Sequence, residues 1–170
     1  MKVIHEDTRQ KPGEHDMKAV HFSSQGWTVA RTKLYVGDYM LPGGLVSVDT
    51  KRDIYELAQN LKQQHDRFRG ECVRAQEAGY ELVVLVENEE GVHDLFGLAD
   101  WIEPASHYAA RVRKSGGKVR QRFKGTDLFK ACRTMQERYG VRFEFCEPGR
   151  AGARVLSILC EGRGDVRDDA

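Results

Sequence analysis

Five apolar residues in a row, Leu82–Val86, constrain the fold of this chain more than any other feature of its sequence. Glu81 and Glu87 flank the run, and three of its five residues are valine. A short, charge-bounded apolar run of this kind is typical of a strand that is buried on both faces. Such a strand needs a helical layer on each side, so the run predicts an α/β domain.

Apolar residues at helical spacing predict helices in four other segments, 14–25, 54–61, 68–79 and 126–140, and a short apolar run predicts a fifth helix at 155–160. Thr126 is the expected N-cap of the helix over 126–140, because its hydroxyl can accept from a backbone N–H of the first turn. Strands are expected where apolar and β-branched residues cluster or alternate, at 1–6, 27–33 and 141–145. The 170 residues predict a single domain over 1–160, with a frayed tail over 161–170.

A hairpin is predicted where Pro42-Gly43-Gly44 separates two β-branched runs, 36–41 and 45–51. Asp38 lies on its first strand, and Asp49 and Lys51 lie on its second. Side chains alternate along a strand, so those of Asp49 and Lys51 project from one face, and the hairpin brings Asp38 alongside them. The residues expected on the opposite face are Val48 and Thr50.

Two carboxylates and one ammonium at a sheet edge form a set suited to phosphodiester hydrolysis. Carboxylates hold a hard divalent cation, usually Mg²⁺, for which Mn²⁺ is the expected substitute. The metal polarises the phosphate and lowers the pKa of a bound water, while the lysine stabilises negative charge. The spacing D-x(10)-D-x-K is the general PD-(D/E)XK nuclease pattern. Acid-x-lysine pairs are also frequent on solvated hairpins, so coincidence explains the triad alone more often than nuclease activity does.

The residues around the triad extend this pattern over roughly residues 1–90, in the segments Ile4–Arg9, Val36–Tyr39, Val48–Lys51, Asp53–Leu61, His65–Arg69 and Leu82–Glu87. In this order they resemble the nuclease domain of the XPF family, which carries V-D-x-R-E, G-D and E-R-K elements. The whole chain looks like the small single-domain versions of phages and prophages. The resemblance implies a restriction-endonuclease-like core with a mixed central β-sheet flanked by helices. It also implies a metal-dependent DNA endonuclease selective for flap, fork or branched DNA, in repair, recombination or phage DNA processing.

The resemblance also implies a role for each matching residue. Asp38 and Asp49 would hold the metal, and Lys51 would face the attacking water. Asp7 would be a further metal ligand, and Arg9 would contact phosphate. An exposed turn pair after a strand explains Asp7 and Arg9 equally well. XPF-type domains pair through their helices, so a homodimer is also expected.

The chain departs from the family pattern at three positions. Asp49 stands in place of the Glu of E-R-K, Thr50 in place of its Arg, and Gln10 in place of the last Glu of V-D-x-R-E. Thr50 and Gln10 favour an alternative function, a non-catalytic DNA- or protein-binding module on a degenerate nuclease fold. Glu71 and Glu87 could join the site, although ordinary surface acids are the more common explanation.

The net charge of +1, from 27 Lys and Arg against 26 Asp and Glu, conceals an uneven distribution. Seven cations and no acid lie between 111 and 124, and the rest of the chain has 20 basic and 26 acidic residues. With Ser115-Gly116-Gly117 near its centre, the segment 108–125 predicts a flexible loop that contacts a DNA backbone, or else a solvated connection. Tyr108 and Phe123 could stack on bases. The expected DNA contacts are Arg113, Lys114, Lys118, Arg120 and Arg122.

Several functional classes are excluded by motifs that the sequence lacks. No run approaches the ~20 apolar residues of a membrane span, and no signal-peptide core is visible, so a cytoplasmic location is expected. A phosphate-binding loop ending in Lys-Ser/Thr and a G-x-S-x-G elbow are both absent, which argues against nucleotide-driven motors and α/β-hydrolases. The four cysteines form no C-x-x-C pair, so reduced thiols are expected rather than a zinc site.

Overall fold

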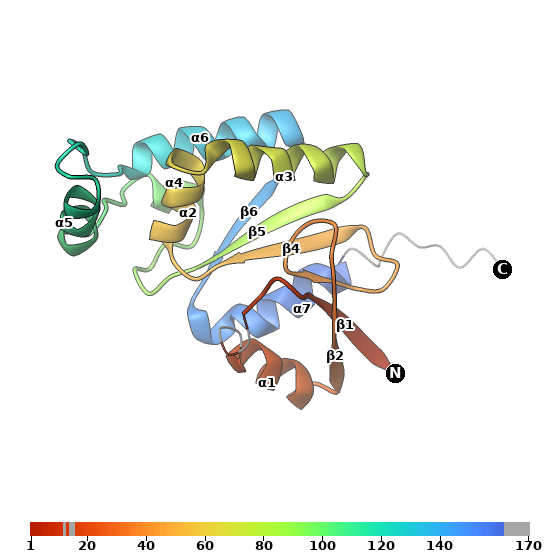
Figure 1. Ribbon diagram of the computed structural model, residues 1–170. Coiled ribbons are helices and arrows are strands. Elements are labelled where there is room, and N and C mark those ends of the chain that lie inside the picture. The colour runs from red at the N-terminus through yellow and green to blue at the C-terminus, as the bar shows by residue number, and fades with distance from the viewer. Residues whose placement is uncertain (12, 14–15, 162–170) are drawn as a thin grey trace.

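The computed structural model describes residues 1–11, 13 and 16–161, and the strands among them form one six-stranded sheet (Figure 1). In the order β2-β1-β3-β4-β5-β6, these strands are β2 (Trp27–Thr32), β1 (Lys2–Asp7), β3 (Tyr39–Met40), β4 (Val46–Lys51), β5 (Glu81–Glu87) and β6 (Arg142–Cys146). Strand β3 runs antiparallel to both of its neighbours, whereas the other pairs are parallel. The predicted α/β fold with a mixed central sheet is confirmed.

Helices cover both faces of this sheet (Figure 1). One face carries α2 (Ile54–Lys62), α3 (His65–Glu77), α4 (Leu95–Leu98) and α6 (Gly125–Tyr139). The other carries α1 (Asp16–Ser24) and α7 (Ala151–Glu161), which the 3₁₀ turn η1 (Pro148–Arg150) precedes. No helix of the described residues is long and apolar enough to cross a membrane.

The apolar run in β5 joins the two cores that these layers form. Val84 and Val86 pack into the core beneath α2, α3 and α6, and Val83 and Leu85 pack into the core beneath α1 and α7. This alternation confirms that the run is buried on both faces. It also explains the absence of a polar stripe from the run, since neither face of the strand meets solvent.

The sheet register brings the hairpin residues to one edge. Tyr39 pairs with Val48, so Asp38 lies opposite Asp49. Strands β1, β4 and β5 run in the same direction, so their C-terminal ends lie at the same edge of the sheet. Asp7, Lys51 and Glu87 are the last residues of these three strands.

Three predicted boundaries need correction. The first strand of the hairpin contains only Tyr39–Met40, because the chain bends just before it, at Gly37, whose φ is +70°. Thr126 is not an N-cap, because α6 begins at Gly125 and residue Lys124 occupies the N-cap position without a capping side-chain hydrogen bond. Of the predicted tail, Glu161 is the last residue of α7, and 162–170 lie outside the described residues.

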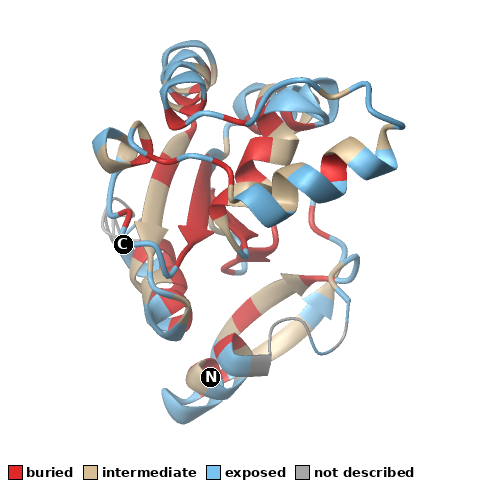
Figure 2. Ribbon diagram, turned by 90° about the vertical axis from the view of Figure 1, so that its left-hand side faces the viewer, coloured by how far each residue is buried: buried red, intermediate tan, exposed pale blue. Residues whose placement is uncertain are grey.

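The predicted flexible loop over 108–125 is wrong in its first half, which is the helix α5 (Ala105–Lys114). This helix projects beyond the sheet at one end of the molecule, and most of its surface is exposed (Figures 1 and 2). We call residues 102–124 the basic arm. The sequence pattern missed α5 because its one buried residue is Arg111, which contributes no apolar periodicity.

Candidate active site

A cavity of about 400 Å³ opens at the sheet edge where β1, β4 and β5 end. Charged side chains dominate its lining, and we call it the cleft. Its six acids are Asp7, Asp38, Asp49, Glu56, Glu71 and Glu87, and its six bases are Arg9, Lys18, Lys51, Arg52, Arg67 and Arg74. A charged cleft of this kind suits a charged ligand better than an apolar one.

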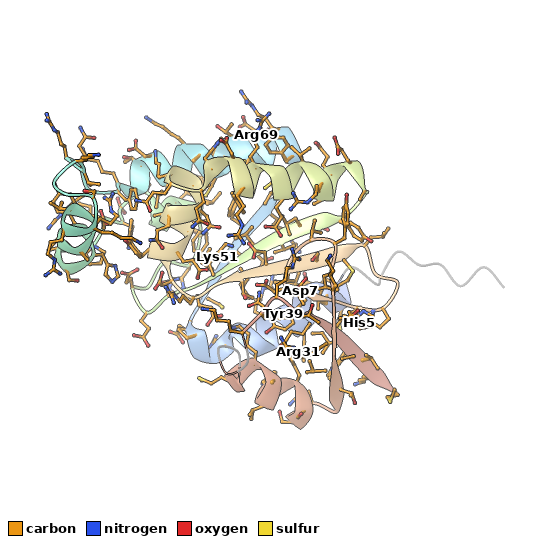
Figure 3. The ribbon with its side chains drawn as sticks, viewed as in Figure 1. His5, Asp7, Arg31, Tyr39, Lys51 and Arg69 are labelled. Carbon is orange, nitrogen blue, oxygen red and sulfur yellow. The ribbon has the colours of Figure 1, made fainter. Side chains whose placement is uncertain are left out.

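The structure brings the predicted triad together at this edge. Lys51 lies at the end of β4 (Figure 3). Its Nζ is 2.6 Å from Oδ2 of Asp49. Oδ2 of Asp38 accepts hydrogen bonds from the backbone N–H of Thr50, at 2.7 Å, and from its hydroxyl, at 2.8 Å. Val48 packs into the core beneath α1 and α7, on the face of the sheet opposite the triad, as expected. Thr50 was expected on that face too, but its hydroxyl donates to Asp38.

Burial sets the electrostatics of the two carboxylates. Loss of solvation is the main reason that the pKa of Asp49 is raised to about 6. The charge of Lys51 opposes this shift, and the charge of Asp38 adds to it. Burial likewise raises the pKa of Asp38, against the pull of Lys51 and Thr50. Burial alone would lower the pKa of Lys51, but the charges of Asp49 and Asp38 outweigh it and the pKa is raised. The lysine therefore stays charged, and a bound cation would stabilise the ionised form of the two buried acids.

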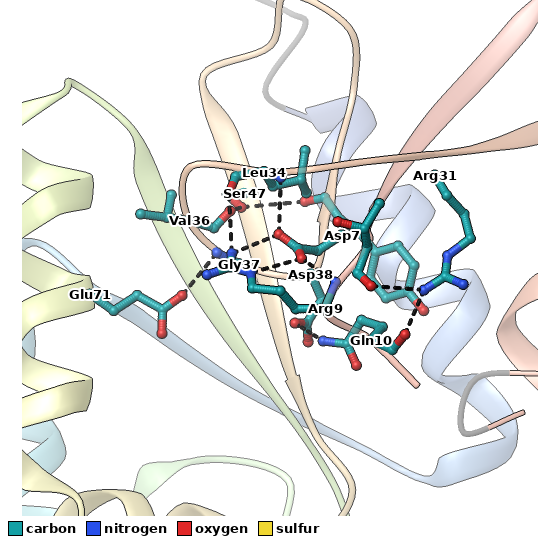
Figure 4. Close-up of polar contacts among 12 residues, drawn as sticks. Asp7, Arg9, Gln10, Arg31, Leu34, Val36, Gly37, Asp38, Ser47 and Glu71 are labelled. Atoms are coloured by element: carbon teal, nitrogen blue, oxygen red, sulfur yellow. Dashed lines mark hydrogen bonds and ion pairs between the residues drawn. The ribbon is translucent and has the colours of Figure 1, made fainter. Parts of the chain in front are cut away.

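Gly37, which precedes Asp38, is required by the local backbone. Its φ is +70°, and a Cβ at this position would lie 2.2 Å from Oγ of Ser47. The Gly37 N–H donates to Oε1 of Glu71 at 3.0 Å, so α3 is tied to the start of the hairpin (Figure 4). The G-D pair therefore has a structural cause, because only glycine allows the chain to turn Asp38 into the cleft.

Asp7 is buried, so the interpretation of Asp7 and Arg9 as an exposed turn pair is wrong for the acid. Nε and Nη2 of Arg9 donate to the two oxygens of Asp7, at 2.8 and 2.6 Å (Figure 4). The backbone N–H of Leu34 also donates to Asp7. Burial would raise the pKa of Asp7, but these hydrogen bonds outweigh it and the pKa is lowered. Gln10, the other departure at this strand end, donates its amide to Oδ1 of Asp38.

Three residues of the cleft were missed or misjudged from the sequence. Glu87 is buried rather than an ordinary surface acid, and Glu71 is half-buried against the hairpin. Lys18, on α1, is buried and forms an ion pair with Glu87. Helical spacing placed Lys18 in a helix, but no sequence signal connects it to a strand end almost seventy residues away.

The donor set can be tested against a divalent cation. No three Asp, Glu, His or Cys side chains of the described residues converge into a ready-made metal centre. Mg²⁺ often binds through one or two carboxylates together with waters and substrate phosphates. Asp38 and Asp49 are hard oxygen donors of the right type, and burial penalises their charges in the absence of a counterion. The two residues therefore fit Mg²⁺, whereas the charge of Asp7 is already balanced by the Arg9 guanidinium in an ion pair.

The basic arm is held at its base by a buried ion pair. Nε and Nη2 of Arg111 each donate to Glu103 at 2.6 Å, and the backbone N–H of Phe123 donates to the same carboxylate at 2.9 Å. The guanidinium of Arg111 lies 3.8 Å from the centre of the Phe123 ring. Phe123 is thus buried, and the prediction that it stacks on bases is wrong. The five predicted DNA contacts are exposed on the arm: Arg113, Lys114, Lys118, Arg120 and Arg122.

The sequence matches no protein-family model and no curated protein. Among solved structures, the chain is similar to XPF from Aeropyrum pernix, at 18% identity and a TM-score of 0.61, over 95% of this chain and 61% of that one. A second structure, XPF from Aeropyrum pernix in complex with DNA, matches at 20% identity and a TM-score of 0.60, over 95% of this chain and 64% of that one. The chain thus spans about three fifths of the length of these structures. The predicted XPF-like fold is confirmed.

Proposed function

We propose that the protein is a metal-dependent DNA endonuclease that hydrolyses phosphodiester bonds. The observation that carries the proposal is the meeting of buried Asp38, Asp49 and Lys51 in one charged cleft of an XPF-like fold. The similarity to an XPF structure in complex with DNA supports DNA as the substrate. The finer expectations, namely a preference for flap, fork or branched DNA, a role in repair, recombination or phage DNA processing, a homodimer and a cytoplasmic location, are part of this proposal.

In this proposal Asp38 and Asp49 hold Mg²⁺, with Mn²⁺ as its substitute. When bound, the ion polarises the phosphodiester and lowers the pKa of a coordinated water. Lys51 keeps its charge next to Asp49 and stabilises negative charge that develops on the phosphate. Asp7 was predicted as a further ligand, but its contacts favour a different role, that of holding the half-exposed Arg9 toward the substrate.

The basic arm supplies the DNA-binding surface in this proposal. Arg113, Lys114, Lys118, Arg120 and Arg122 are exposed, and no acid lies between 104 and 126. Phosphate contacts of this kind bind DNA independently of sequence and weaken as salt concentration rises. The enzyme would therefore select DNA by backbone shape rather than by base sequence.

The second candidate function is a non-catalytic DNA- or protein-binding module. The observation that favours it is the saturation of Asp38, whose two oxygens already accept from Thr50 and Gln10. A carboxylate with several donors has fewer lone pairs for a metal. DNA binding that is tight and indifferent to Mg²⁺ would support this candidate.

A cleavage panel of labelled flap, fork, Holliday-junction and linear DNA, with and without Mg²⁺, tests the proposed function. Asp49→Ala serves as the inactive variant, and Asp127→Ala, at an exposed acid outside the cleft, is its matched control. Metal-dependent cutting by the parent and by Asp127→Ala, but not by Asp49→Ala, is the expected result. Parent protein that leaves every substrate intact, or an Asp49→Ala variant that cuts like the parent, would overturn the proposal.

A further inference from the structure

Lys18 is a buried lysine of the cleft, and the proposed function gives it no role. Its side chain is 8% exposed, and it forms an ion pair with Glu87, whose side chain is 9% exposed. Both side chains line the same cavity as Asp38, Asp49 and Lys51. A buried ion pair is weak evidence for a stabilising role, because well-packed apolar residues in its place often stabilise a fold equally well.

The position of Lys18 complements that of Lys51. Lys51 faces the helices α2 and α3, where its Nζ lies 5.7 Å from the centre of the Phe68 ring. Lys18 belongs to α1, on the opposite face of the sheet, and meets Glu87 at the end of β5. In the pairing of β4 with β5, Lys51 lies opposite Val86, the residue before Glu87. Two ammonium groups therefore reach the same sheet edge from its two faces.

We propose that Lys18 is a substrate-binding residue of the cleft, which contacts a non-bridging oxygen of the phosphodiester held at Asp38 and Asp49. This inference rests on the proposed function and names a contact of the same site. A lysine ammonium binds phosphate as a compact point charge, without the fixed geometry that an arginine requires. Glu87 acts as a positioning residue in this arrangement, because its carboxylate holds the ammonium at the cleft wall. Lys18 and Lys51 then flank the phosphate from two sides.

The test separates a phosphate contact from a structural ion pair with the double variant Lys18→Met, Glu87→Leu, which replaces the pair by apolar residues of similar size. Lys2→Met is the control. Lys2 is a lysine at the start of β1, about 16 Å along the strand from the end that carries Asp7. Three quantities are measured for each protein: the urea midpoint of unfolding, the affinity for a short labelled duplex in Ca²⁺ as a function of salt, and kcat and KM in Mg²⁺.

The double variant is expected to keep the urea midpoint of the parent, whereas its kcat/KM falls at least about tenfold, as expected for a lost hydrogen bond to a charged group. The slope of log K against log salt becomes shallower by about 0.9, which corresponds to one phosphate contact. Lys2→Met should match the parent in all three quantities. A double variant with the slope and kcat/KM of the parent would show that the pair is structural, and it would overturn the inference while leaving the proposed function intact.

A second variant decides the question if the double variant does not fold. Glu87→Gln removes one negative charge next to the Lys18 ammonium, so DNA affinity should rise while the salt slope stays at least as steep as in the parent. A lower affinity together with a shallower slope contradicts the inference. If the parent itself cuts no DNA, the proposed function fails, but the salt slopes still decide whether Lys18 contacts phosphate.

Discussion

The cleft is lined by six basic side chains and the basic arm exposes six, but the surroundings of these charges differ between the two regions. In the cleft the bases face six acids, and Lys18 and Lys51 are buried in ion pairs. On the arm, no acid lies between 104 and 124, and this stretch carries six exposed cations: Arg113, Lys114, Lys118, Arg120, Arg122 and Lys124. Paired, buried charges act at short range with fixed geometry, whereas exposed charges of one sign attract a polyanion from a distance. Under the proposed function, this difference assigns catalysis to the cleft and DNA affinity to the arm.

The sharpest test of this division is Asp49→Asn, which removes a proposed metal ligand and leaves the arm intact. Cleavage should fall by roughly 10³-fold, since charge stabilisation at the phosphate is lost. DNA affinity, measured by anisotropy in Ca²⁺, should stay within about threefold of the parent, since phosphate contacts on the arm dominate it. An equal loss of cleavage and of DNA affinity would show that catalysis and DNA binding are not separated between the cleft and the arm.

The next largest effect is expected at the base of the arm. Arg111→Met leaves the Glu103 carboxylate buried without its cation, which should lower the free energy of unfolding by about 3 kcal/mol. Arg113→Met, two residues away and exposed, should change it by less than about 0.5 kcal/mol. Urea unfolding of the two variants measures the difference, and equal stabilities would mean that the ion pair does not anchor the arm.

Removing charge from the arm should weaken DNA binding and leave the rate of cleavage unchanged, which is the opposite of the effect expected for Asp49→Asn. The triple variant Arg113→Ala, Lys118→Ala, Arg120→Ala should bind DNA more weakly, with a salt slope shallower by about 2.7 for three lost contacts. Its kcat at saturating DNA should equal that of the parent, because the cleft is unchanged. A fall in kcat with unchanged affinity would place the arm in the chemistry instead.

The smallest effect expected is a pH dependence confined to the cleft. The pKa of Asp49 is raised from 3.8 to about 6, so the carboxylate takes up a proton as pH falls through 6, and that proton competes with the metal. Metal affinity, measured calorimetrically with Mn²⁺, should therefore fall about tenfold between pH 7 and pH 5. Metal affinity of Asp49→Asn should show a smaller change over this range, since the carboxylate that takes up the proton is absent from the variant. Metal affinity that is independent of pH would contradict the assignment of Asp49.

The part of the site that the sequence predicts is the part made by local geometry. Alternation along one strand places Asp49 beside Lys51, and the turn at Pro42-Gly43-Gly44 returns the chain to Asp38. Both rules involve residues close in sequence, so no knowledge of the remaining fold is needed. The apolar run in β5 similarly predicts its own burial, because no other environment accommodates it.

The parts that the sequence pattern misses depend on distant partners or on charge where apolar residues are expected. Lys18 contacts Glu87 only because α1 packs against the sheet. Lysine and glutamate are usually exposed, so neither residue predicts that the pair is buried. Helix α5 contributes Arg111 to the interior, so its inward face reads as polar although it is buried. Periodicity of apolar residues cannot detect a helix that packs through an ion pair.

The closure of the arm at its base has a further consequence. Ile102 and Lys124 pair as an isolated bridge, and the Gly125 N–H donates to the carbonyl of Trp101 at 2.6 Å. A Cβ on Gly125 would lie 2.0 Å from the Leu98 carbonyl oxygen, so the two ends of the arm are held in contact. A segment that leaves and re-enters a domain at one point can change length and composition without displacing the sheet. The outer part of the arm, beyond this junction, can therefore be shortened or replaced without moving the strands that carry the cleft.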